Sequence, residues 1–68
     1  MQEGTVKFFN NTKGIGLITS TKSGKDITVN TSGLIDEIKT NDNVHFQIEQ
    51  NNEGDIATQV EILNHLFI

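Results

Sequence analysis

The sequence alternates short apolar–polar runs with turn-forming clusters, and this pattern limits the chain to short strands. In "DITVN" and "NVHFQIE" every second residue is apolar, as in a strand that buries one face. "GTVKFFN", "GIGLITS" and "IATQVEIL" give three further runs of strand character. The clusters between them, "NNTKG", "TKSGK", "KTNDN" and "QNNEGD", are typical of turns. Five short strands without crossover helices predict an all-β domain.

A sheet of five short strands is stabilised best by closing on itself, because closure removes its unpaired edges. We therefore predict a five-stranded antiparallel barrel. In the second strand, Ile15 and Leu17 are expected on one face and Ile18 on the other. The predicted inward-facing residues are Val6, Ile18, Ile27, Val29, Val44, Phe46, Ile48, Ile56, Val60 and Ile62.

Two stretches interrupt the strand pattern. The adjacent rings of Phe8 and Phe9 break the alternation of the first run, and a β-bulge there would accommodate both of them. Whether one of these two rings belongs to the core stays open at this point. "SGLIDEI" (32–38) has helical spacing with Ser32 as its N-cap, which predicts a helix of one or two turns.

The 68 residues are expected to form one domain, 1–68, with residues 64–68 as a tail extension. The absence of cysteine excludes a disulfide and a cysteine-based zinc site. No apolar run reaches the length of a signal peptide or of a membrane span, so we expect a soluble, cytoplasmic protein with no membrane association.

The charge is unevenly distributed along the chain. The formal net charge of −4 argues against a general polyanion binder. Residues 1–25, however, hold four lysines against Glu3 alone, a balance of +3, whereas residues 26–68 have a balance of −7. Two interpretations remain: the N-terminal part faces an anionic partner, or its lysines only solubilise strand edges.

No residue set predicts catalysis or metal binding. His45 and His65 lie twenty residues apart without a cluster of further ligands, and no nucleophile is spaced with a base. Gly14 and Gly16 are not followed by a helix, so they indicate a turn and close strand packing instead of a phosphate loop. We expect no enzyme, no cofactor and no small-molecule substrate, because so small a barrel has no deep pocket.

Three motifs in sequence order carry a family resemblance. The chain reads "GTVKFFN", "KGIGLI" and "DITVNTS" where cold-shock domains typically read G-x-V-K-W-F-N, K-G-F-G-F-I and D-V-F-V-H-F-S. The resemblance extends from about Glu3 to Leu63, nearly the whole chain. It implies a five-stranded OB-fold barrel of cold-shock-domain type.

The resemblance also implies a single-strand-binding surface. In that family, rings on adjacent strands stack on the bases of single-stranded RNA or DNA, and lysines contact the backbone. Carried over by position, the implied nucleic-acid-binding residues are Lys7, Phe8, Phe9, Asn10, Lys13, Ile15, Leu17, Thr28, Asn30 and Thr31.

Most of the stacking rings are replaced in this chain. The family usually has Phe, Phe, Phe, His and Phe at positions occupied here by Ile15, Leu17, Thr28, Asn30 and Thr31. Each stacked base contributes about 1–3 kcal/mol, so the loss of two or three contacts lowers affinity by roughly two orders of magnitude or more. The sequence therefore predicts a weak binder.

Three hypotheses about function follow. The preferred one is weak binding of single-stranded nucleic acid, serving RNA chaperoning or gene regulation, because the retained lysines accompany the retained rings. The second is a protein-interaction module whose apolar patch is formed by Phe8, Phe9, Ile15 and Leu17. The third is self-association through the apolar tail "LFI", so the expected state is a monomer or a weak self-associate.

Overall fold

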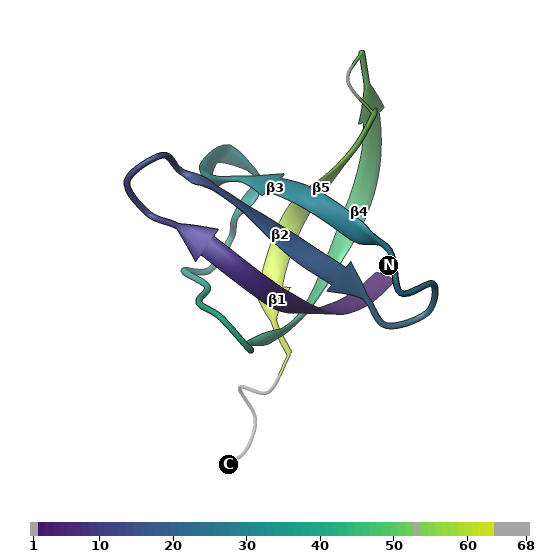
Figure 1. Cartoon of the computed structure of the whole chain (residues 1–68), viewed down its shortest axis with the longest axis horizontal. Helices are drawn as coiled ribbons and strands as arrows, with labels where there is room; N and C mark the ends of the chain where they lie inside the picture. Colours follow the sequence, from purple (N-terminus) through teal and green to yellow (C-terminus); the bar gives the residue numbers. More distant parts are fainter. Residues whose placement is uncertain (1, 53, 64–68) are drawn as a thin grey trace.

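A computed structural model describes residues 2–52 and 54–63 of the chain, and these form a closed five-stranded barrel (Figure 1). The elements are β1 (Gln2–Asn10), β2 (Ile15–Ser20), β3 (Asp26–Asn30), the 3₁₀ helix η1 (Thr31–Gly33), β4 (Asn43–Asn51) and β5 (Gly54–Ile62). Around the barrel the strand order is β1-β2-β3-β5-β4. The hairpin of β4 and β5 extends beyond the barrel wall. The predicted tail, residues 64–68, lies outside the described residues.

The barrel is confirmed, but its strands are not all antiparallel as predicted. Four neighbouring pairs are antiparallel, whereas β3 and β5 run parallel through Thr28–Ile56 and Val29–Ala57. The reason is topological: a closed ring with an odd number of strands cannot alternate direction at every pair. One parallel seam is therefore unavoidable, and here it lies between β3 and β5.

The core contains most of the residues predicted to face inward. Ile48 and Ile62 are only partly buried and pack against the others, while Ile38 and Ala57 complete the core without having been predicted. The buried core residues are Val6, Ile18, Ile27, Val29, Ile38, Val44, Phe46, Ala57 and Val60.

The prediction that Ile56 faces inward is wrong, because β5 contains a bulge. Gln59 has a φ of 53°, and Gln59 and Val60 together lie opposite Phe46 on β4. The bulge changes the alternation, so that Ala57 and Val60 both enter the core. Ile56 consequently lies on the outer face, half-buried.

The helix predicted over 32–38 is also wrong. Only η1 forms, and Ser32 is inside it; the N-cap is Asn30, whose side chain makes no cap hydrogen bond. After η1 the chain follows β5: the Ile35 amide donates to the Val60 carbonyl over 2.9 Å, and an Asp36 carboxylate oxygen accepts from the Ile62 amide over 3.0 Å. Pairing with β5 therefore satisfies backbone groups that a helix would otherwise use.

The bulge predicted in the first run is present. Val6 pairs with Ile18 and Phe8 with Leu17, so Lys7 is the extra residue of β1. Val6 is buried, Lys7 and Phe8 are exposed, and the following ring, Phe9, packs against the core. Within the described residues, no helix is long and apolar enough to cross a membrane.

Candidate nucleic-acid interface

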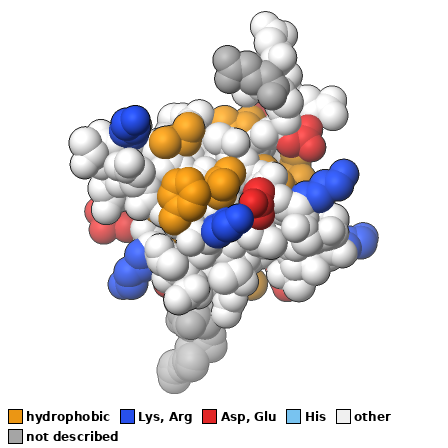
Figure 2. All heavy atoms as spheres, in the orientation of Figure 1, with side chains coloured by type: hydrophobic (Ala, Val, Ile, Leu, Met, Phe, Trp, Pro, Cys, Tyr) orange, Lys and Arg blue, Asp and Glu red, His pale blue; other side chains and the backbone are white. Residues whose placement is uncertain are grey.

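Four side chains lie in register across the outer face of four strands. Phe8 of β1 pairs with Leu17 of β2, Leu17 with Thr28 of β3, and Thr28 with Ile56 of β5. We call these four residues the cross-strand row. Phe8 is 45% exposed and is the one ring in the row. Figure 2 shows hydrophobic side chains gathered at the centre of this face.

A second, shorter row runs beside the first. Asn10 pairs with Ile15, and Ile15 with Asn30. Ile15 is 40% exposed, whereas Asn30 is half-buried. Five residues predicted from the resemblance, Phe8, Ile15, Leu17, Thr28 and Asn30, thus share one continuous surface.

Asn10 and Thr31 hold the turn between β1 and β2 in place. The Asn10 side-chain oxygen accepts from the backbone amides of Thr12 and Lys13, over 3.0 and 3.2 Å. The Thr31 hydroxyl donates to the Gly14 carbonyl over 3.1 Å, and the Thr31 amide donates to the same oxygen over 2.9 Å. Because these polar groups are already engaged, both residues position Lys13 and Ile15 within this fold.

The Gly-x-Gly spacing has a steric cause at each position. Gly14 has a φ of 71°, in the left-handed region that favours glycine. At Gly16, a β-carbon would lie 2.6 Å from Cδ1 of the Phe9 ring and would also meet the Phe8 carbonyl. Gly16 therefore lets β1 and β2 approach closely at the point where the two rings diverge.

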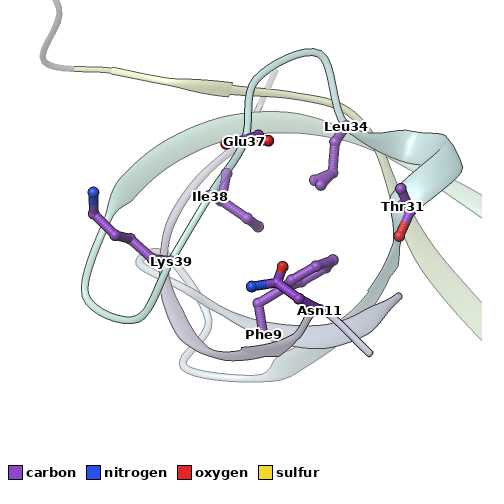
Figure 3. A pocket seen from close by; sticks show the side chains of 7 residues that line it. All are labelled: Phe9, Asn11, Thr31, Leu34, Glu37, Ile38 and Lys39. Carbon is purple, nitrogen blue, oxygen red and sulfur yellow. The ribbon is translucent and has the colours of Figure 1, made fainter. Parts of the chain in front are cut away.

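Phe9 does not join the cross-strand row. It lines a hollow of about 400 Å³ at the end of the barrel, together with Leu34 and Ile38. Figure 3 shows these three side chains pointing toward one another inside the ring of strands. Because Phe9 also packs against the core, its ring is held away from the outer face on which Phe8 lies.

Lysines lie around the apolar centre of the face (Figure 2). The Lys7 ammonium pairs with Asp26 across 3.0 Å, and the Thr19 hydroxyl donates to the other Asp26 oxygen over 2.9 Å. The hydrogen bond from Lys7, followed by the one from Thr19, lowers the pKa of Asp26 below its ordinary value of 3.8. Within the described residues, the side chain of Lys13 forms no hydrogen bond or ion pair and is exposed.

From the ion pair of Lys7 and Asp26 we predict a specific pH dependence of stability. A carboxyl whose pKa is lowered by folding stabilises the folded state above its unfolded pKa, and this contribution is lost as pH falls through the folded pKa. Asp26→Asn should therefore be less stable than the natural protein at neutral pH, and the difference should shrink below about pH 3.8. Urea unfolding at a series of pH values measures this. Thr19→Val, which removes one hydrogen bond to Asp26, should lose part of the same stability at neutral pH. A stability difference between Asp26→Asn and the natural protein that persists undiminished at low pH would contradict this role of Asp26.

Sequence reasoning missed two residues of this surface. Ile56 extends the row onto β5; the bulge at Gln59 places it on the outer face, and no sequence signal marked this bulge. Asp26 was not among the predicted site residues, although it holds Lys7 beside the row. A bulge was predicted at Phe8 and Phe9; it lies at Lys7, and with the strand order it brings Lys7 and Asp26 to the same outer face.

Comparisons with known proteins identify related chains. The profile of the 'Cold-shock' DNA-binding domain matches residues 2–63. The chain is similar to the cold shock-like protein CspA of Vibrio cholerae, with 36% identity over 88% of this chain and 91% of the relative. It is also similar to the cold shock protein of Arthrobacter globiformis, with 39% identity over 93% of this chain and the whole relative.

One solved structure shares the fold. The Drosophila Unr CSD456 structure superposes with a TM-score of 0.79 and 20% sequence identity. The match covers 98% of this chain and 28% of that one.

Proposed function

The chain belongs to the cold-shock domain family, and we propose that it binds single-stranded RNA or DNA, weakly, on the outer face of β1, β2 and β3. The observation that carries the proposal is the cross-strand row, a partly exposed and mainly apolar strip with lysines around it. Bases present apolar faces and phosphates present negative charge, so this combination suits a nucleic acid better than an uncharged partner.

The weakness follows from the composition of the row. Stacking on an aromatic ring is worth about 1–3 kcal/mol per base, and Phe8 supplies the one exposed ring of the row. Leu17 and Ile15 offer apolar contact without a π-face. In addition, a phosphate that approaches Lys7 competes with Asp26, and the net charge of −4 opposes the approach of any polyanion.

We propose that the protein is cytoplasmic and that it acts in RNA chaperoning or in gene regulation. It acts as a binding protein and not as an enzyme, in line with its family. Its state is a monomer or a weak self-associate, and neither a cofactor nor a small-molecule substrate takes part.

Lysine substitutions test the proposed surface. Lys13→Ala should weaken binding of labelled poly-pyrimidine and poly-purine strands and should reduce the salt slope by about 0.7, the value for one phosphate contact on a single strand. Lys7→Ala should weaken it less, because the Lys7 ammonium must leave Asp26 before it can contact a phosphate. Fluorescence titrations at several salt concentrations give both quantities.

The matched control is Lys13→Arg, which keeps the charge and should keep both affinity and slope. An unchanged affinity in Lys13→Ala would place the phosphate contacts elsewhere. Chemical-shift changes confined to residues outside β1, β2 and β3 would have the same consequence.

A further inference from the structure

A small hollow lies where the cross-strand row meets the β4–β5 hairpin. Its volume is about 140 Å³. That space suits a single flat ring system and is too small for a folded segment of a partner chain. The hollow is lined by Ile15, Thr28, Asn30, Asn51, Asp55 and Ile56.

The hollow is continuous with the surface proposed to hold a strand. Thr28 and Ile56 belong both to its lining and to the cross-strand row, and Ile15 lies in the neighbouring row. A strand that stacks one base on Phe8 and continues along the row past Leu17 therefore reaches the hollow. Ile15 and Ile56 supply apolar walls against which its ring can lie.

Two polar groups in the lining lack internal partners. Within residues 2–52 and 54–63, no hydrogen bond or ion pair is formed by the Asp55 carboxylate or by the Asn30 side-chain amide. Asn30 is half-buried, so its amide gains from a partner inside the hollow. A carboxylate can only accept hydrogen bonds, so a group that fits beside Asp55 must donate them.

We propose that this hollow receives one base of the bound strand and selects a base with amino hydrogens on its edge, guanine foremost. The N1–H and N2–H groups of guanine are adjacent donors that match the two oxygens of a carboxylate. Thymine and uracil present one N–H between two carbonyl oxygens, and those oxygens are repelled by Asp55. The inference rests on the proposed function and names a base preference for the same face.

A second hollow, beside the small one, leaves a path for the sugar–phosphate backbone of the bound strand. Asp55 and Thr28 also line a larger depression of about 680 Å³, which includes Lys22 and Lys25 on the turn between β2 and β3. A strand whose base enters the small hollow can lay its phosphates beside these two ammonium groups. The carboxylate then faces the base edge while the lysines face the backbone.

The test compares two ligands that differ in one amino group. A short labelled thymine strand carries a single central guanine, or hypoxanthine, which has the same ring system without the exocyclic amine. The natural protein should bind the guanine strand about fivefold or more tightly, the lower end of the range for a bidentate contact. Asp55→Ala should bring this ratio close to one. The side-chain amide signals of Asn30 should shift with the guanine strand.

The control variant is Glu49→Ala, which removes the same charge from the residue paired with Ile56, outside the lining of the hollow. It should keep the guanine preference. Equal affinity of the natural protein for both strands, or equal loss of the preference in both variants, overturns the base-selecting hollow. If binding still weakens in Lys13→Ala, the proposed function stands without it. Absence of binding to every strand at low salt overturns both.

Discussion

Phe46→Ala is expected to leave little folded protein. The ring is fully buried in β4, and its Cε1 atom lies 3.2 Å from the place where a β-carbon on Gly4 would be. Removing a buried phenylalanine costs about 3–5 kcal/mol, which includes the cavity left behind. Natural domains have only about 5–15 kcal/mol of stability, and so short a chain is near the lower end. Urea unfolding followed by circular dichroism measures the loss.

The matched control for this prediction is Phe8→Ala, which removes the same ring from an exposed position of the row. Its free energy of unfolding should change far less than that of Phe46→Ala, while its affinity for single strands should fall. A Phe46→Ala variant that melts at an unchanged temperature would mean that β4 has a different register in solution.

Restoring the missing rings should strengthen nucleic-acid binding at least tens of times. In the triple variant Ile15→Phe, Leu17→Phe, Thr28→Phe, the rings at 17 and 28 lie in register with Phe8 across β1, β2 and β3, and the ring at 15 lies in the neighbouring row. Directly opposite residues on paired strands lie about 5 Å apart, so successive rings form a continuous stacking surface. Each ring should add on the order of 1 kcal/mol or more when a base lies flat on it. Titration of a labelled pyrimidine strand gives the ratio.

Ile35→Phe is the control for this prediction, because Ile35 is 57% exposed and lies outside both rows. It adds a ring to the surface without extending the stacking face, so affinity should not rise. A folded triple variant with no gain would show that something other than the rings limits affinity. The proposed ligand would then be abandoned in favour of a protein partner that contacts the natural Ile15–Leu17 patch.

Much of the barrel could be predicted because its strands alternate clearly. Val44 and Phe46 on β4, and Ile27 and Val29 on β3, are separated by polar residues, and all four are buried. A bulge in β1 was predictable for a related reason: two adjacent rings cannot both satisfy a strict period of two. Its position at Lys7 became evident only from the strand register.

Features that depend on tertiary contacts could not be predicted. A bulge centred on a glutamine with positive φ has no composition signal, so the sequence around Gln59 did not indicate that Ile56 would lie on the outer face. The spacing of Leu34, Ile35 and Ile38 resembles a helix, yet hydrogen bonds to β5 hold this segment along the barrel end. Of the candidate site, Phe8, Leu17 and Thr28 were predicted from the family resemblance, whereas Ile56 and the engagement of Lys7 by Asp26 required the three-dimensional arrangement.

The parallel seam has a consequence for the order in which the barrel assembles and opens. It joins β3 to β5 through only two residue pairs, and parallel pairs are slightly less stable per residue than antiparallel ones. It also connects segments distant in the chain, so the intervening chain must lose conformational entropy before the contact can form. Closure between Val29 and Ala57 is therefore a late folding event, and hydrogen exchange should begin there. Because Thr28 and Ile56 form one of the two pairs of this seam, a nucleic-acid strand bound along the row would hold β3 and β5 together and slow the exchange.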